Sequence, residues 1–531
     1  MRTFTWSRVM SAIIVAAGAC VLVASATGKG TAQQAQTPVR GGTLVVSLAG
    51  DPGTLNPDLN TYSTHAVEIA RNIFDTLVAY NSKWQTIPDL ARTWKVSPDA
   101  KTVTFHLAKN VKWSDGTPFT SADVKWTYGA IKTQKGWAID YLSNVRSIQT
   151  PDKYTVVLKL SHPDASLVST LADQGLSILP AHLYKGTDWN KNPANLKPVG
   201  TGPYIFDSYT PDAQVVLKAN PKYFQGGPYL DKLVFQVTPD QATALAALQS
   251  GQVQFTTNFA PPGTVPSLQK NKNVRVDFYT YPVIAYQAYN LNRKPLNNPL
   301  VRKALAYAVD RNAINRIAQN GLTTTANHLY LEGAWATSKG VVLPKYNPTL
   351  ANRLLDQAGF KRDKDGNRFS LEYLIYTGYG VEPVADVVKE QLKKVGIKLN
   401  IDALEWGSYV TKGTDRKDFD VMFGMGFTGP DPSLIGPFVK SGGFSNVSGY
   451  SNATVNHLLQ KAVATPNEAT RARYYRQIQQ ILLRDMPRLP LFDRKVPFPV
   501  AANCHNFWTD SNPEAWKQQG ERSYWKVWCS K

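Results

Sequence analysis

Alternating apolar and polar residues define the segment 90–128 as a strand followed by a turn and a capped helix. Residues 103–107 alternate between apolar and polar side chains, which is the period of a half-buried strand. The Ser-Asp-Gly sequence at 114–116 suits a tight turn, because glycine accepts a positive φ. Thr120 and Asp123 have the spacing of a capping box, so a helix is expected to begin after Thr120.

Helix-then-strand units are predicted in the second half of the chain. Apolar spacing predicts one amphipathic helix over 301–320, with Gly321 just beyond its end. A further helix is expected over 382–395, closed by Gly396, and an alternating strand follows at 397–401. Units of this kind are typical of a mixed α/β lobe.

The first 26 residues have the pattern of a secretory signal peptide. Two arginines precede an apolar run at 9–26, and Ala-Ser-Ala at 24–26 offers a cleavage site. No comparable apolar run follows. We therefore expect cleavage near Ala26 and a soluble, exported protein of the bacterial periplasm.

Cys20 offers an alternative to this reading of the N-terminus. Ala-Gly-Ala-Cys at 17–20 has the outline of a lipoprotein box, and a lipid on Cys20 would anchor the protein to a membrane. Alanine stands where that box usually has leucine, and the apolar run continues beyond the cysteine. Cleavage near Ala26 is the expectation, and lipid anchoring at Cys20 is the alternative.

Length and charge narrow the classes of protein to consider. A chain of 531 residues suggests two or three domains, and 43% hydrophobic residues suffice for large cores. A net charge of +20 suggests a nucleic acid as partner. The basic residues are scattered, however, with no run of five or more, so no nucleic-acid partner is expected.

Two cysteines near the C-terminus, Cys504 and Cys529, are candidates for a disulfide. In an oxidising compartment their pairing would close a loop of about 25 residues, which is worth roughly 3–3.5 kcal/mol in the chain-entropy model. Two unpaired thiols are the alternative. We expect the disulfide.

A glycine-rich motif at 424–429 resembles a dinucleotide-binding fingerprint only superficially. Pro430, Asp431 and Pro432 follow it directly, and no acidic residue occurs between Asp431 and Glu468 to hold a ribose. We expect a turning loop near a ligand instead. The seven histidines are isolated, and no metal site, cofactor or catalytic group is predicted. The chain is therefore not expected to be an enzyme, and a secreted hydrolase is the distant alternative.

Several motifs from about residue 40 to residue 500 share one family pattern. Together they resemble the bacterial extracellular solute-binding proteins of the oligopeptide/dipeptide type (family 5), which are the periplasmic components of ABC transporters. The motifs are Trp94, Phe105, 115–119 and 123–124 in the first segment, then 200–204, 220–224, 301–304, 308–311, 354–360 and 449–452.

The resemblance implies an α/β protein with a three-lobed type II periplasmic binding protein fold. Two lobes would close over the ligand at a hinge of crossing strands, placed at 285–291 and 496–502. The implied segments are a signal peptide at 1–26, a linker at 27–39, a discontinuous domain I at 40–80, 200–287 and 495–531, a small lobe or domain II at 81–199, and domain III at 288–494.

The function implied by the resemblance is the capture of short peptides for an inner-membrane ABC permease, by a monomer. Asp431 is the predicted contact for the peptide ammonium group. In peptide-binding relatives the matching loop usually carries a tryptophan and an earlier aspartate, whereas this chain has Phe427 and a shorter loop. Asp431 is alternatively a helix N-terminal residue. Further predicted ligand contacts are Phe427, Thr428, Tyr62, Thr64, Trp406, Tyr409 and Tyr286.

This departure at Asp431 keeps other solutes open. An oligosaccharide, an opine-like conjugate or a metal chelate would fit the same transport role, because the family has diversified widely. The sequence therefore predicts the family and the transport role more firmly than it predicts the solute.

Overall fold

The structure is a computed structural model that divides into the units 1–38 and 39–531, and all but two of the described residues belong to the second. The predicted signal peptide and Cys20 lie outside the described residues. Within the described part of the chain, no helix combines the length and the apolar character needed to cross a membrane. The described residues are 37–59, 64–81, 84–172, 176–257, 260–329, 335–337, 340–377, 380–427, 429, 431–443, 445–507 and 523–530.

Most strands belong to one mixed, 11-stranded sheet. Its neighbours include parallel pairs, such as β1 with β10 and β14 with β15, and the long antiparallel pair of β12 with β17. This arrangement confirms the predicted α/β class. In sheet order the strands are β15 (Ile397–Leu404), β14 (Phe369–Tyr376), β16 (Val421–Phe427), β12 (Val274–Tyr289), β17 (Arg488–Ala501), β11 (Phe255–Thr256), β1 (Thr43–Leu48), β10 (Lys232–Val237), β9 (Gln214–Ala219) and β8 (Tyr204–Thr210), with β13 (Thr324–Thr325) paired to β17.

The buried apolar side chains of the described residues form two cores. The first core draws its members from 44–283 and 496–527, and the second core draws them from 285–492. The first core thus spans the predicted domains I and II, and the second lies in the predicted domain III except for Ala285 and Tyr286 of the predicted domain I. The domain limits themselves stay a prediction.

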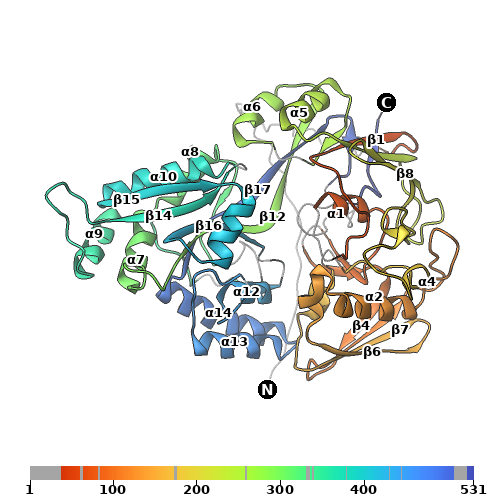
Figure 1. Ribbon diagram of the computed structural model, residues 1–531, viewed down its shortest axis with the longest axis horizontal. Helices are drawn as coiled ribbons and strands as arrows, with labels where there is room; N and C mark the ends of the chain where they lie inside the picture. The colour runs from red at the N-terminus through yellow and green to blue at the C-terminus, as the bar shows by residue number, and fades with distance from the viewer. Residues whose placement is uncertain are drawn as a thin grey trace, which may run out of the picture. The chain divides into compact units, whose positions relative to one another are not determined.

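Strands β12 and β17 are the two segments that cross between the cores (Figure 1). Along β12, Val283 belongs to the first core and Ala285 to the second. Along β17, Phe492 belongs to the second core and Val496 to the first. The crossing therefore lies at the inner edges of the predicted hinge strands. A paired two-strand connection of this kind lets two bodies rotate about a few backbone positions.

The capped helix and its strand form as predicted in a separate four-stranded sheet. In β5, apolar side chains are buried and polar ones are more exposed. The hydroxyl of Thr120 accepts a bond from the first turn of the helix, and the carboxylate of Asp123 accepts one from the backbone N–H of Thr120 at 2.8 Å. The sheet order is β4 (Ala91–Val96), β5 (Thr102–Leu107), β7 (Thr155–Leu160) and β6 (Val145–Asp152), with the helix α2 (Ser121–Thr133) packed against it.

The helix predicted over 301–320 is wrong as a single element. Two helices occur instead, α7 (Pro299–Ala308) and α8 (Arg311–Ala318), because Val309 has an extended backbone. Asp310 then caps α8 by accepting a bond from the backbone N–H of Ala313 at 3.0 Å. An aspartate that caps a helix offers the backbone a better end than continued helix, so it overrides the apolar spacing.

The predicted unit at 382–401 is confirmed. The helix α10 (Glu382–Lys394) connects the parallel strands β14 and β15, and Gly396 between α10 and β15 has a φ of +83°. The second core also contains side chains of α9 (Pro348–Gln357), α11 (Trp406–Val410), α12 (Gly436–Val439), α13 (Ala453–Val463) and α14 (Glu468–Asp485).

Candidate functional site

Two glycines of β16 make room for two aromatic rings. A Cβ atom added at Gly424 would lie 2.6 Å from the ring of Tyr286, which is on the paired strand β12. A Cβ atom added at Gly426 would lie 2.9 Å from the ring of Phe438 on α12. Both separations are shorter than real Cβ contacts allow. Glycine is therefore required here by close packing rather than by a turn.

The turning loop expected over 424–429 is consequently wrong in its first half. Strand β16 runs on to Phe427, which pairs with Val283 of β12. The prediction failed because glycine is a common turn signal in sequence, whereas the bulk of rings on neighbouring elements is visible only in the fold.

Replacing Gly424 with alanine is expected to lower the free energy of unfolding by roughly 1–3 kcal/mol, because the new methyl group must displace the Tyr286 ring. Urea unfolding followed by circular dichroism measures the change. The matched control is Gly436→Ala in α12, where a Cβ atom meets nothing within 4 Å. Equal effects of the two substitutions would contradict the packing role of Gly424.

Arg488 covers both rings. The central carbon of its guanidinium lies 4.9 Å from the ring centroid of Tyr286 and 5.0 Å from that of Phe438, and both rings belong to or pack on the second core. The rings meet edge to face at 6.2 Å. A cation over ring faces is attracted by their quadrupoles, most strongly where water is excluded. Burial raises the pKa of Tyr286, so its hydroxyl stays neutral at physiological pH.

Trp406 and Tyr409 of α11 and Tyr376 of β14 form an aromatic platform. The Trp406 ring is 63% exposed, stacks on Tyr409 with centroids 5.5 Å apart, and meets Tyr376 edge to face at 5.3 Å. Tyr409 is buried and its hydroxyl donates to the backbone carbonyl of Phe423 in β16. The outer ring is thus open to solvent while the rings beneath it are fixed.

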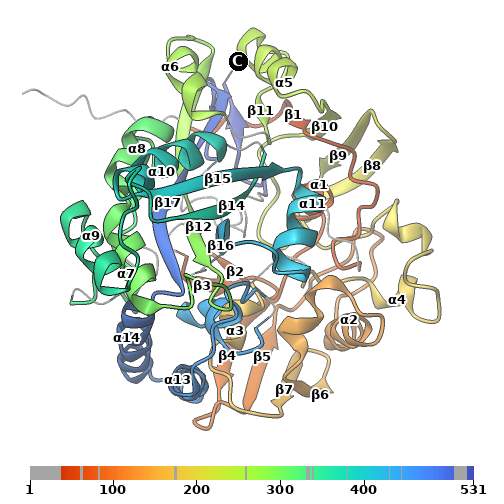
Figure 2. The same ribbon diagram turned by 60° about the vertical axis from the view of Figure 1, so that its left-hand side comes forward.

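The position of the platform follows from the start of α11. The side chain of Glu405 accepts bonds from the backbone N–H groups of Gly407 at 2.9 Å and Ser408 at 2.5 Å. A hydrogen bond from the Ser408 side chain, together with these two backbone bonds, lowers the pKa of Glu405, and the backbone bonds hold the first turn of the helix. Figure 2 shows α11 beside β14 and β15, with which it makes contacts.

Asp431 lies in a buried ion pair. Its Oδ1 atom is 2.7 Å from Nη2 of Arg471, a residue of α14, and both side chains are largely shielded from solvent. The same oxygen accepts a bond from the backbone N–H of Ser433 at 2.9 Å, so Asp431 also caps the short helix that follows. The alternative given above, a helix N-terminal aspartate, is therefore present. Ammonium binding by Asp431 stays a prediction.

The other predicted contacts divide into three groups. Tyr409 and Tyr286 belong to the second core, and the exposed Trp406 stacks on Tyr409. Tyr62 and Thr428 lie outside the described residues. Thr64 begins α1 (Thr64–Ala70) and Phe427 ends β16, and only their backbone is described.

Four residues of these clusters were missed by sequence reasoning: Tyr376, Phe438, Arg471 and Arg488. None belongs to a chemical motif. Each reaches its cluster through strand pairing or helix packing between distant segments, as β17 brings Arg488 beside Tyr286. Local sequence carries no signal for such neighbours.

The predicted disulfide is confirmed. Cys504 and Cys529 are bonded, and they also face each other across the short strands β18 (Cys504–His505) and β19 (Trp528–Cys529). The bond fixes the C-terminal segment to the end of β17.

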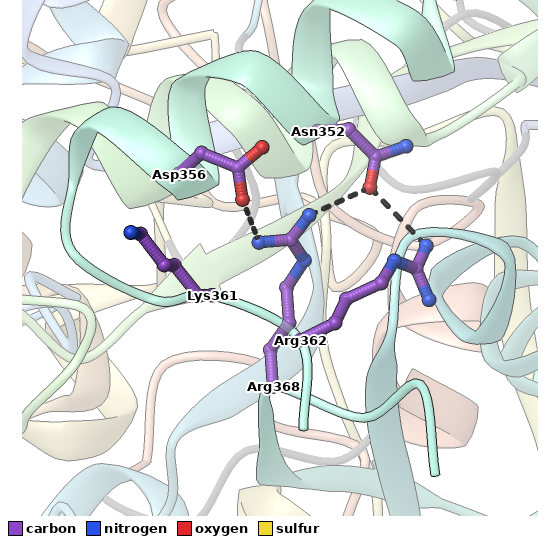
Figure 3. A pocket seen from close by; sticks show the side chains of 5 residues that line it. All are labelled: Asn352, Asp356, Lys361, Arg362 and Arg368. Carbon is purple, nitrogen blue, oxygen red and sulfur yellow. Dashed lines mark hydrogen bonds and ion pairs between the residues drawn. The ribbon is translucent and has the colours of Figure 1, made fainter. Parts of the chain in front are cut away.

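A cavity of about 630 Å³ lies elsewhere, beside α9, and its two arginines are engaged by the protein itself (Figure 3). Arg368 donates to Asp356 at 2.5 Å, to Asn352 at 3.0 Å and to the backbone carbonyl of residue 395 at 3.0 Å. Arg362 donates to the carbonyl of residue 394 at 2.8 Å. These carbonyls end α10, so the arginines serve as helix C-terminal caps, and we do not assign this cavity to a solute.

The family model for bacterial extracellular solute-binding proteins, family 5 Middle, matches residues 85–446. This match covers well over half of the chain. The chain belongs to the family 5 solute-binding proteins. The recognition made from the motifs is thereby confirmed, and so are the fold class and the solute-binding role.

Relatives of this family 5 protein resemble it over nearly their whole length. The oligopeptide-binding protein AppA of Bacillus subtilis (strain 168) is 30% identical over 86% of this chain and 87% of its own. Its structure in complex with a nonapeptide gives a TM-score of 0.76 at 26% identity, covering 93% of this chain and 100% of that one. The PBP AgaA from A. tumefaciens R10, in complex with agropinic acid, gives 0.76 at 29% identity, covering 92% and 99%.

Proposed function

We propose that this family 5 protein captures short peptides in the periplasm and delivers them to an inner-membrane ABC permease. It would act as a monomer, after cleavage near Ala26, with neither a cofactor nor enzymatic activity. The observation that carries the peptide assignment is the similarity to AppA, which covers most of both chains and whose structure holds a nonapeptide. Closure about β12 and β17 would be stabilised by contacts that the solute makes only in the closed state.

The aromatic platform is the proposed wall of the solute site. A solute that stacks on Trp406 would cost the protein little side-chain entropy, because Tyr409 and Tyr376 already pack against the Trp406 ring. Tyr286 is proposed as a deeper wall on the hinge strand β12. Phe427, Thr428, Tyr62, Thr64 and Asp431 remain predicted contacts.

Replacing Trp406 with alanine is expected to weaken peptide binding about tenfold or more while leaving the fold intact, since an exposed ring contributes to stacking and little to the core. Isothermal titration calorimetry with a peptide that binds the wild-type protein measures the affinity, and thermal unfolding measures stability. Ile317→Ala is the matched control, because Ile317 is 64% exposed and lies on α8. Unchanged affinity of the Trp406 variant would remove the platform from the site.

The solute class is tested on protein purified without refolding. Native mass spectrometry identifies any co-purified ligand, and thermal shifts are then recorded with a library of di- to pentapeptides. A bound ligand raises the midpoint of unfolding by mass action. No shift with any peptide, beside a clear shift with a sugar or a metal chelate, would contradict the peptide assignment.

An opine-like conjugate is the second candidate. AgaA, whose structure holds agropinic acid, is 29% identical to this chain, as similar as the peptide-binding relative. In addition, Asp431, which is predicted to bind the peptide ammonium group, is already paired with Arg471. Agropinic acid therefore belongs in the same thermal-shift series, and a shift with it alone would favour this candidate.

A further inference from the structure

Two different parts of the chain donate hydrogen bonds to the C-terminal end of α13. The last carbonyls of a helix have no partner within it and need one elsewhere. The carbonyl of Ala462 accepts a bond from Nε of Arg471 at 2.9 Å, within the second core. The carbonyl of Val463 accepts a bond from the backbone N–H of Ala165 at 2.7 Å. Ala165 follows β7, whose side chains pack in the first core, so this bond bridges the two cores.

The loop that carries Ala165, residues 161–166, is held rigidly on its own side. Asn144 bonds both the backbone N–H and the carbonyl of His162, at 3.0 and 2.9 Å. The backbone N–H of Asp164 donates to the carbonyl of Ala100 at 2.8 Å, and its carboxylate accepts two bonds from Ser166. A loop fixed in this way loses little entropy when it docks.

The surface that receives the loop is also fixed. Arg471 pairs with Asp431, and its guanidinium lies 5.1 Å from the ring centroid of Trp335 and 5.8 Å from that of Tyr475. Asp164 of the loop interacts electrostatically with this pair. Burial raises the pKa of Asp164 despite the bonds from Ser166, and the charge of Asp431 raises it as well, while Arg471 opposes them. The charges of Asp431 and Arg471 thus act on a carboxylate from the other side of the contact.

We propose that residues 161–166, the end of α13 and the Arg471–Asp431 pair form a latch that holds the two lobes closed independently of solute contacts. This inference rests on the proposed function as a binding protein that closes about β12 and β17. Because the latch consists of protein atoms alone, it sustains a measurable closed population without solute. It also gives Asp431 a role in closure instead of a role at the peptide ammonium group.

Interlobe distances measured by double electron–electron resonance test the latch. Spin labels are placed at Lys125→Cys on α2 and Lys389→Cys on α10, both exposed helical positions. Cys504 and Cys529 are already joined, so they do not take label. The latch-breaking change is Ala165→Arg, which adds bulk and positive charge at the residue that donates the bond to Val463. The matched control is His162→Arg, which adds the same charge at an exposed position of the same loop.

Ligand-free wild type and His162→Arg are expected to show a closed population that Ala165→Arg loses. With tetra-alanine as the probe, release from Ala165→Arg should be about tenfold faster, as expected for one lost hydrogen bond with added repulsion. Val463→Glu changes the residue on the other side of the contact and should also lose the closed population. This second variant keeps the test valid if Ala165→Arg fails to fold. Identical distance distributions in wild type and both variants, or a wild type that is wholly open without solute, would overturn the latch. If tetra-alanine leaves the wild-type distances unchanged, that result would contradict the proposed peptide binding but not the latch. The latch is tested by the ligand-free comparison, which does not depend on the peptide.

Discussion

Asp431→Asn is expected to lower the free energy of unfolding by about 3–5 kcal/mol, the loss found when one partner of a buried ion pair is removed. The substitution leaves Arg471 buried beside Trp335 and Tyr475 without its counter-charge. Guanidinium chloride unfolding, followed by fluorescence, measures the loss. The double variant Asp431→Asn/Arg471→Met should regain part of it, because no uncompensated cation then remains.

A surface pair supplies the control. Asp418 pairs with Arg293 and is 53% exposed, so Asp418→Asn should change stability by less than about 1 kcal/mol. Equal losses of unfolding free energy at Asp431 and Asp418 would show that the buried ion pair contributes no more to stability than the surface pair.

The same Asp431 variant separates closure from ammonium recognition. If Asp431 acts through the latch, Asp431→Asn weakens tetra-alanine and its N-acetylated form equally. A selective loss for the free amino terminus would instead support the predicted contact with the peptide ammonium group. Titration calorimetry with the two peptides decides between these roles.

Removal of the disulfide by Cys504→Ser/Cys529→Ser is expected to cost roughly 3 kcal/mol, because the closed loop of 25 residues no longer restricts the unfolded chain. The loss should weaken the first core, because the C-terminal segment that the disulfide holds contributes Tyr524 and Val527 to it. The backbone N–H of Tyr524 also donates to Asn72 at 2.8 Å.

The control for the disulfide is reduction of the wild type. Wild-type protein in dithiothreitol should unfold at the same denaturant concentration as the double-serine variant, which should itself be insensitive to reductant. Wild-type protein whose midpoint does not respond to reductant would contradict a stabilising role for the bond.

The success and failure of the sequence predictions follow the range of the interactions behind them. The capping box at Thr120 and Asp123 and the helix end at Gly396 were predicted because each depends on groups a few residues apart. The break at Val309 and Asp310 is equally local, yet the apolar spacing of the flanking helices concealed it. A capping residue inside an apolar pattern deserves more weight than that pattern.

The candidate site was predicted only in part. Trp406 and Tyr409 are on one short helix, so their proximity follows from local spacing. Tyr376, Phe438 and Arg488 join the clusters from other elements, and strand register decides which side chains meet. A shift of one residue in β17 would send Arg488 to the opposite face of the sheet.

The sequence by itself determined the family and hence the fold and the solute-binding role, together with the two cysteines that pair. These properties depend on short motifs and on pairing choices with few alternatives. Only the tertiary structure decided that Gly424 and Gly426 make space for rings, that Asp431 is engaged by Arg471, and that Ala165 meets the end of α13. Those contacts join segments up to hundreds of residues apart, and their energies come from burial and charge pairing that exist only once the two cores are assembled.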